Sequence, residues 1–154
     1  MGRSGDLQGA IAFSDASIEE RGDTPYIWLA RGDVLLARKE QRADYCFEKA
    51  MALAPKDWFV AWMAARIRYY YHQFVLALNL VQRAIEWNAG NFLLWLEMAR
   101  CQQELGLVSM AETSYAQVQQ LNPDCREAHI ALSKLSQAGV LARTRGWLNG
   151  LFKR

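Results

Sequence analysis

The sequence predicts an all-α fold in which helix–turn–helix repeats stack into a solenoid. The first observation is a period of 34 residues that recurs in the segments 41–57, 75–91 and 109–125. Four columns keep this period: Ala43, Ala77 and Ala111; Phe47, Val81 and Tyr115; Ala50, Ala84 and Val118; and Pro55, Ala89 and Pro123. The second is an apolar i, i+3, i+4, i+7 face in each segment. The third is that all three prolines lie at repeat boundaries, where a missing N–H costs little.

Composition narrows the class of protein. The chain has 154 residues, of which 52% are hydrophobic, a length that suits one domain. Its 18 basic and 16 acidic residues leave a net charge of +2 without a basic stripe, so we expect no nucleic-acid partner. No run of 18 apolar residues occurs, so we expect no transmembrane helix.

A partial repeat is expected at residues 1–23, ahead of the full ones. Ala10 stands 33 residues before Ala43, one short of the period, and we place the missing residue in the turn near 39–41. The pattern begins in the middle of a repeat, at Gly5, which suggests that upstream repeats are missing from this chain; a free half repeat is the alternative.

Three full repeats are expected at residues 24–57, 58–91 and 92–125, each as a pair of helices. Thr24 before Pro25 suits a helix N-cap followed by proline in the first turn. Asp57, Asn91 and Asp124 hold comparable places before the later helices.

Within a repeat, small residues should let the two helices approach. The Ala43 column supplies the small side chain, and the Phe47 column supplies a larger one that fills the gap beside it. Gly106 should break the third repeat between its helices, and His72 stands in the same column of the second. Histidine is among the residues tolerated at positive φ.

The last segment, residues 126–154, should cap the stack and end in a basic tail. Residues 126–137 carry apolar side chains at Ala128, Ala131, Leu132 and Leu135, and the rest of the segment apart from Ile130 is hydrophilic. A terminal repeat needs such a polar outer face.

The tail from Val140 onward has four basic residues and no acidic one: Arg143, Arg145, Lys153 and Arg154. Other residues fall close to helical spacing: Val140, Thr144, Trp147, Leu148, Leu151 and Phe152. One interpretation is an amphipathic helix that binds an anionic membrane or a partner's groove. We favour a helix that folds back over the last repeat and buries Trp147 and Phe152, because Gly146 and Gly150 weaken an isolated helix.

These columns resemble the tetratricopeptide repeat over about residues 5–137. The positions that fit its first-helix pattern are Trp28, Gly32 and Leu35, then Ala61, Ala64 and Ala65, then Trp95, Met98 and Ala99. Arg31 stands where that pattern has leucine, Arg68 replaces an aromatic residue, and Gln102 departs from it as well. The resemblance implies a right-handed α-solenoid.

Tetratricopeptide arrays typically bind extended peptides or partner helices along the concave surface lined by their first helices. The resemblance places this groove at Tyr26, Leu29, Asp33, Leu36, Phe59, Trp62, Arg66, Tyr69, Tyr70, Leu93, Leu96, Arg100 and Gln103. Arg66 and Arg100 are one repeat apart, so we expect both to point into the groove and to hold a carboxylate-bearing ligand. The alternative is that Phe59, Trp62 and Tyr69 pack onto neighbouring helices and that the arginines are solvated.

Some tetratricopeptide domains clamp the C-terminal carboxylate of heat-shock chaperones with lysine, asparagine and arginine. Here Trp62 and Leu96 stand where lysine is needed, and Met63 and Glu97 stand where asparagine is needed. We therefore expect no such clamp.

The expected function is noncovalent protein–protein recognition, as a scaffold or adaptor that binds a protein or peptide ligand. One alternative is self-association into a homo-oligomer, or a regulatory segment of a longer polypeptide. Another, less favoured, is a membrane-surface tether through the basic tail. No phosphate loop, nucleophile elbow or HExxH motif occurs, so we expect neither enzymatic activity nor a cofactor.

The remaining reactive residues favour no site. Cys46, Cys101 and Cys125 show no CxxC spacing, which indicates free thiols in a reducing compartment. His72 and His129 lack partners at metal-ligand spacing, so we expect no metal. Because the N-terminus has no apolar signal region, a cytoplasmic location is the expectation.

Overall fold

The computed structural model describes residues 6–151 of the chain. This part holds eight α-helices and no strand: α1 (Leu7–Arg21), α2 (Pro25–Ala37), α3 (Ala43–Leu53), α4 (Trp58–Tyr70), α5 (Phe74–Trp87), α6 (Phe92–Glu104), α7 (Val108–Leu121) and α8 (Arg126–Leu151). The predicted all-α fold is confirmed.

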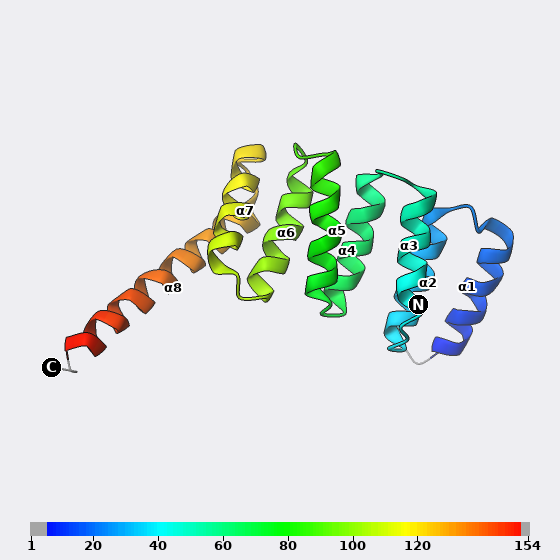
Figure 1. Cartoon of the computed structure of the whole chain (residues 1–154), viewed down its shortest axis with the longest axis horizontal. Coiled ribbons are helices and arrows are strands. Elements are labelled where there is room, and N and C mark those ends of the chain that lie inside the picture. Colours follow the sequence, from blue (N-terminus) through cyan, green and yellow to red (C-terminus); the bar gives the residue numbers. More distant parts are fainter. Residues whose placement is uncertain (1–5, 152–154) are drawn as a thin grey trace. The chain divides into compact units, whose positions relative to one another are not determined.

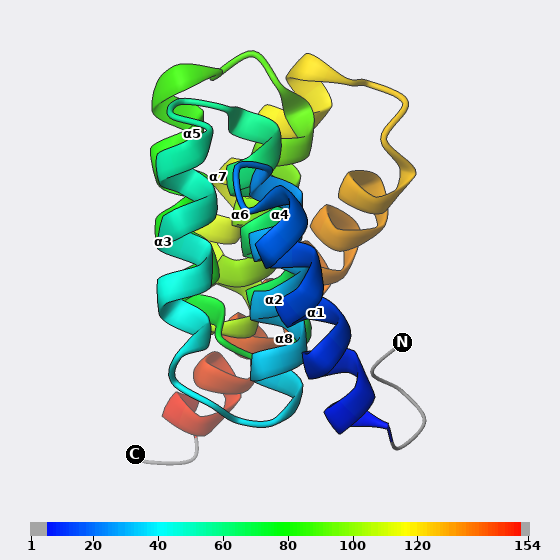
Figure 2. The ribbon, with the colours of Figure 1, turned by 90° about the vertical axis from the view of Figure 1, so that its right-hand side faces the viewer.

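The helices belong to two compact units, Met1–Ala89 and Gly90–Arg154, which we call the N-terminal unit and the C-terminal unit. In the N-terminal unit α2 pairs with α3 and α4 pairs with α5, while α1 packs on α2 and α2 also contacts α4 (Figure 1 and Figure 2). In the C-terminal unit α6 pairs with α7, and α8 packs on α7. Each pair is a helix hairpin of the kind that the 34-residue period predicts.

Phe47 fills the space between α2 and α3. Its side chain is 1% exposed, and Ala43 and Ala50 on the same helix are fully buried. Gly32 of α2 faces the ring so closely that an added Cβ would lie 2.8 Å from Phe47 Cζ. The small residues therefore let these two helices approach, as predicted.

The same columns are buried in the later repeats, at Ala77, Val81, Ala84, Ala111, Tyr115 and Val118. In the C-terminal unit they join one core whose other buried members are Leu96, Ala99, Ala128 and Ala131. Leu132 and Leu135 pack against the edge of this core.

Two of the predicted helix caps form. The Asp57 carboxylate accepts a hydrogen bond from the N–H of Phe59 at 2.9 Å, and the Asn91 side chain accepts one from the N–H of Leu93 at 3.0 Å. Each satisfies a backbone donor that has no partner within its own helix.

The other two predicted caps differ from the expectation. Thr24 precedes Pro25 at the first helical position, but its side chain makes no capping bond. Asp124 lies two residues before α8, which begins at Arg126, and is therefore outside the cap position. At the first of these ends Pro25 lacks an N–H group that would have no partner within the helix.

The turns between paired helices share one conformation. Lys39, His72 and Gly106 follow α2, α4 and α6 at φ values of 59°, 60° and 74°. After each of them the next N–H bonds to the carbonyl five residues back, at 3.0, 2.9 and 2.8 Å respectively. This is the Schellman arrangement, which requires a left-handed residue. The prediction of positive φ at His72 is confirmed.

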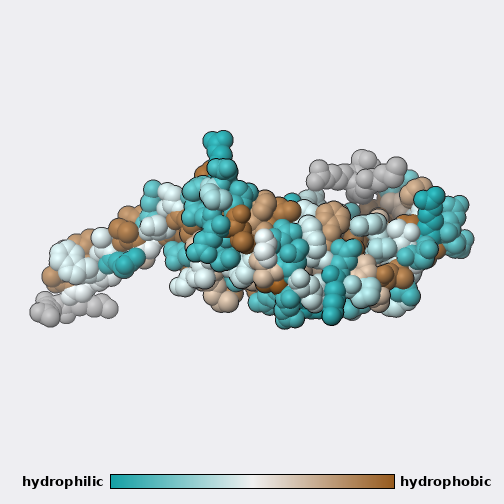
Figure 3. Space-filling view, turned by 90° about the horizontal axis from the view of Figure 1, so that it is seen from above, coloured by the Kyte–Doolittle hydropathy of each residue, from teal (hydrophilic) through white to brown (hydrophobic). Residues whose placement is uncertain are grey.

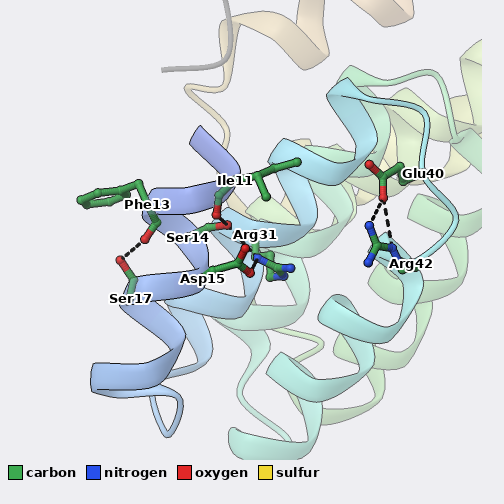
Figure 4. Close-up of polar contacts among 8 residues, drawn as sticks. All are labelled: Ile11, Phe13, Ser14, Asp15, Ser17, Arg31, Glu40 and Arg42. Carbon is green, nitrogen blue, oxygen red and sulfur yellow. Dashed lines mark hydrogen bonds and ion pairs between the residues drawn. The ribbon is translucent and has the colours of Figure 1, made fainter. Parts of the chain in front are cut away.

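Arg31, which stands in place of leucine, connects α2 to α1. Its Nη1 donates to Ser14 Oγ at 2.9 Å, and its guanidinium pairs with the carboxylate of Asp15 (Figure 4). Ser14 Oγ donates in turn to the carbonyl of Ile11 at 2.8 Å. The departure from the repeat pattern therefore provides the polar contact between these helices.

Arg68, which stands in place of an aromatic residue, is only 5% exposed. Its Nη1 donates to Gln73 Oε1 at 2.7 Å and its Nη2 donates to Asp44 Oδ1 at 2.9 Å. A buried guanidinium is tolerated only when its donors are paired, and these two acceptors lie just outside α4, on the neighbouring turn and on α3.

Gln102, the third departure, is 2% exposed. Its Oε1 accepts a hydrogen bond from Ser114 Oγ at 2.7 Å, and Ser114 is equally buried. This hydrogen bond joins α6 to α7 inside the C-terminal unit. Each of the two buried polar side chains therefore has a partner in the other.

The tail continues α8 as a single helix to Leu151 instead of folding back (Figure 1). Trp147 is 68% exposed, so the prediction that it is buried is wrong; Phe152 lies outside the described residues. The physical reason lies on the core-facing side of α8, where Gly139, Ala142 and Gly146 offer no large apolar side chain to bury.

Candidate functional site

A row of four side chains crosses from α2 to α4 on the N-terminal unit. The rings of Tyr26 and Phe59 meet edge-on with their centroids 6.3 Å apart, and the Phe59 ring lies 5.8 Å from that of Trp62. The guanidinium carbon of Arg66 lies 5.8 Å from the centroid of the Trp62 ring, at cation–π distance. We call Tyr26, Phe59, Trp62 and Arg66 the aromatic row.

Helix geometry places these residues on one face. Phe59, Trp62 and Arg66 follow one another at intervals of three and four residues, so they share one side of α4. Tyr26 lies in the first turn of α2, which contacts α4. Tyr26 is 48% exposed and Phe59 is 38% exposed, whereas Trp62 is half-buried and Arg66 is exposed. The row is therefore an accessible apolar strip with a cation at one end.

An apolar cleft adjoins the row between α1 and α2. It has a volume of about 360 Å³ and is lined by Ala10, Phe13, Ser14, Ser17, Tyr26, Ile27, Ala30, Asp33 and Val34. Tyr26 belongs to both the row and the cleft, and Phe13 is 65% exposed at the rim. Sequence reasoning missed Phe13 and the rest of α1, because the predicted groove drew only on the first helices of the repeats.

Tyr69, Tyr70 and Asp33 lie apart from the aromatic row. Tyr69 packs edge-on against Phe74 at 5.2 Å, as the packing alternative proposed. Tyr70 is 57% exposed and its ring lies 5.1 Å from that of Tyr71. The Tyr71 hydroxyl donates to Asp33 Oδ1 at 2.8 Å, which links the ends of α2 and α4.

Three leucines predicted to line the groove are in the core instead. Leu29 is 2% exposed, Leu36 is 8% exposed and Leu96 is 6% exposed. Their apolar side chains pack against neighbouring helices, so they offer no accessible surface. These residues are therefore corrected from groove to core.

Arg100, in the C-terminal unit, is held by two carboxylates. Its Nη1 donates to Glu97 Oε2 at 3.0 Å and its Nε donates to Glu127 Oε1 at 2.6 Å. Burial lowers the pKa of Arg100, but the hydrogen bonds and charges of Glu127 and then Glu97 outweigh it, so the pKa is raised. The expectation that Arg100 offers its charge to a ligand is therefore corrected: two acids already neutralise it.

Glu97, one helical turn before Arg100, was the signal in the sequence for this pairing, whereas Glu127 is contributed by a distant helix. The other predicted residues of this unit are peripheral. Leu93 is half-buried, and the exposed Gln103 accepts a hydrogen bond from the Tyr115 hydroxyl at 2.8 Å.

Among residues 6–151 no cluster of His, Cys, Asp or Glu has the geometry of a metal site. The exposed His129 contacts the Pro123 carbonyl at 2.7 Å through Nε2 and the Gln119 side chain at 2.6 Å through Nδ1. Cys46, Cys101 and Cys125 are free thiols. Burial raises the pKa of the Cys46 thiol, against the smaller opposing effects of Arg31 and Arg42.

None of the helices within residues 6–151 is both long and apolar enough to cross a bilayer.

Comparison with known proteins identifies the repeats. Residues 71–135 match the family model of the tetratricopeptide repeat. No curated protein sequence matches the chain.

Solved structures resemble the fold at low sequence identity. The first tetratricopeptide domain of Spaghetti (RPAP3), bound to the HSP90 peptide SRMEEVD, is 21% identical with a TM-score of 0.64, over 76% of this chain and 94% of that one. MamA residues 41 to the end, from Desulfovibrio magneticus RS-1, is 15% identical with a TM-score of 0.68, over 91% and 80%. YrrB, a tetratricopeptide protein with an unusual peptide-binding site, is 22% identical with a TM-score of 0.63, over 87% and 70%.

These structures support the fold, and the match over residues 71–135 supports the repeat that gives rise to it. The buried small-residue columns and the left-handed turns carry the same repeat into the helices that precede this match. Residues 71–135 thus match the tetratricopeptide repeat, and the described helices have the fold of solved tetratricopeptide structures.

Proposed function

We propose that the N-terminal unit binds a peptide segment noncovalently on the aromatic row, and that the protein acts as a protein–protein interaction module. The observation that carries this proposal is the contact chain Tyr26–Phe59–Trp62–Arg66, in which two exposed rings lead to a half-buried indole and an exposed guanidinium. Tyrosine, tryptophan and arginine are the residue types that dominate binding energy at protein interfaces.

The row selects a ligand of particular chemistry. An apolar ligand side chain would be buried against Tyr26 and Phe59, with the cleft beside Tyr26 as room for a larger one. A carboxylate about one helical turn further along would meet the Arg66 guanidinium, whose planar fork suits bidentate binding. The ligand is therefore an extended segment that combines a large apolar residue with an acidic one.

The structural relatives support peptide binding as a class of function. The ligand proposed for this chain differs from the heat-shock peptide that one of them binds. Two of them carry a bound peptide or a peptide-binding site by their description. In the present chain Trp62 and Met63 stand where a heat-shock carboxylate clamp has lysine and asparagine. We therefore propose that the ligand is an internal peptide segment with one acidic and one large apolar residue. The C-terminal peptide of a heat-shock chaperone is not the proposed ligand.

The test is fluorescence polarisation of the full chain with labelled ten-residue peptides that differ in one pair of residues: Leu with Glu, Leu with Lys, and Ser with Glu. The Leu–Glu peptide should bind more tightly than either of the others. Arg66→Gln should weaken its binding by about tenfold and remove the preference for Glu over Lys. Phe59→Ser should weaken the Leu–Glu peptide by at least about tenfold, because it removes exposed apolar contact.

Two variants on α5 of the same unit are matched controls. Arg83→Gln removes one exposed positive charge, and Val75→Ser removes one exposed apolar side chain, both away from the row. Both should leave peptide affinity unchanged. If Arg66→Gln behaves like Arg83→Gln, and Phe59→Ser like Val75→Ser, the row is not the binding site. A rise in mass with concentration in light scattering, lost in Phe59→Ser, would instead assign the row to self-association.

A further inference from the structure

The second half of α8 exposes a stripe of large apolar side chains. Val140, Leu141, Trp147, Leu148 and Leu151, which we call the C-terminal stripe, are 53%, 61%, 68%, 46% and 55% exposed. In Figure 3 brown, apolar patches alternate with pale and hydrophilic ones along α8. Five such residues on twelve consecutive positions form a continuous patch, whereas single exposed apolar residues need no explanation.

The stripe lies on the opposite side of α8 from the face that packs on the core. At 3.6 residues per turn its five side chains occupy an arc of about 120°, and the centre of that arc is about 180° from Ala128, Ala131, Leu132 and Leu135. Along the core-facing side the later positions are Gly139, Ala142 and Gly146. The stripe is therefore a second apolar face, and it is not an extension of the cap.

Thr144 is the one polar residue within the arc of the stripe. Its hydroxyl is close to the carbonyls of Val140 and Leu141, at 3.1 and 3.0 Å. Because the hydroxyl is satisfied by the helix itself, this position can enter an apolar environment at little cost.

Cations flank the stripe on both sides. At 100° per residue Arg145 lies about 40° beyond one edge of the arc, and Arg143 lies about 40° beyond the other. Residues 138–151 contain no Asp or Glu, and the sequence continues with Lys153 and Arg154. An apolar face bordered by arginines, with tryptophan near its end, complements an apolar surface bordered by negative charge.

We propose that the C-terminal stripe docks on the surface of a bilayer that contains anionic lipid, with α8 lying in the plane of the interface. Residues 140–151 would extend about 18 Å along that surface, with Trp147 at the level of the headgroups. Arg143 and Arg145 would reach phosphate or carboxylate groups on either side. A second copy of the chain fits less well, because two such helices would bring arginines together with no acid in the segment to pair them. This surface is independent of the aromatic row.

The experiment is co-sedimentation of the full chain with vesicles of phosphatidylcholine alone and with vesicles that also contain 30% phosphatidylserine, at about 0.1 M and 0.5 M salt. The protein should bind the anionic vesicles at low salt, and Arg143→Gln with Arg145→Gln should weaken binding by about fivefold per arginine. Leu141→Ser with Leu148→Ser should weaken it by at least about tenfold. The matched control is Val75→Ser with Leu76→Ser, a pair of comparable exposure on α5, which should bind like the unchanged chain.

All four of these side chains are exposed, so the variants should keep the helix content of the unchanged chain in circular dichroism. Three results would overturn the proposal. They are no binding to anionic vesicles, equal binding to neutral and anionic vesicles, or a loss of vesicle binding in the α5 control pair as large as the loss in Leu141→Ser with Leu148→Ser. Concentration-dependent mass in light scattering that disappears in Leu141→Ser with Leu148→Ser, without vesicle binding, would assign the stripe to a second copy instead.

Discussion

The guanidinium carbon of Arg68 lies 4.5 Å from the centre of the Phe47 ring, so a buried cation covers the aromatic side chain that fills the first full repeat. Gly32 contacts the same ring from α2. Phe47 thus joins α2, α3 and α4 of the N-terminal unit. This arrangement explains how a repeat can keep its packing with arginine where an aromatic residue is usual.

Arg68→Ala should lower the free energy of unfolding of the N-terminal unit by about 3 kcal/mol, because it removes the ring contact and leaves a gap. Arg68→Leu should lower the free energy of unfolding by no more than about 1 kcal/mol, because leucine already fills the equivalent position, Leu35, in the first repeat. The Asp44 carboxylate that loses its partner is 63% exposed and can be hydrated. Urea denaturation measures both. Arg83→Leu, on the exposed side of α5, is the control; equal costs for the two Arg68 variants would contradict the packing role.

Gly32→Ala should destabilise the N-terminal unit by about 1–3 kcal/mol, because its methyl group would lie 2.8 Å from Phe47 Cζ in a space already filled. Gly146→Ala is the matched change at a helical glycine, with nothing within 4 Å of the added Cβ, and should be neutral or raise helix stability by up to about 1 kcal/mol. Thermal unfolding followed by circular dichroism separates the two. A neutral Gly32→Ala would show that the ring can move aside.

Lys39→Gly and His72→Gly should each stabilise the fold by about 1 kcal/mol, because both residues hold a left-handed conformation that glycine adopts without a steric penalty. Gly106→Ala, at φ 74°, should destabilise by a similar amount. Midpoints of urea unfolding, with opposite signs for the two kinds of change, are the measurement. Shifts of the same sign would show that side-chain contacts outweigh the turn.

Alkylation by iodoacetamide should modify Cys125 first, because Cys46 is 2% exposed and Cys101 is 0% exposed while Cys125 is half-buried. The raised pKa keeps Cys46 a neutral thiol in the folded state; that preference favours folding below the ordinary thiol pKa and is lost as the pH rises through the raised one. Mass mapping of the labelled peptides over pH 7 to 9 tests this order. Denaturation in urea should equalise the three rates; equal rates in the native protein would contradict the burial of Cys46.

The candidate site was only partly predictable. Tyr26, Phe59, Trp62 and Arg66 share a face that helical spacing defines, so sequence alone could bring them together. Leu29 holds the same column as Trp62, one repeat earlier, but is 2% exposed, so exposure in this column depends on which helices pack around it.

Sequence by itself determined the helices, the hairpins, the left-handed turn at His72 and the small-residue columns, since these depend on local propensity and on a period that repeats along the chain. Only the tertiary structure decided that Glu127 neutralises Arg100, that α1 adds a cleft beside Tyr26, and that Trp147 stays in solvent. Each of these outcomes depends on which side chains of another helix come within reach. Neighbours across helices follow no period in the chain, so exposure and charge pairing had to come from the packed molecule.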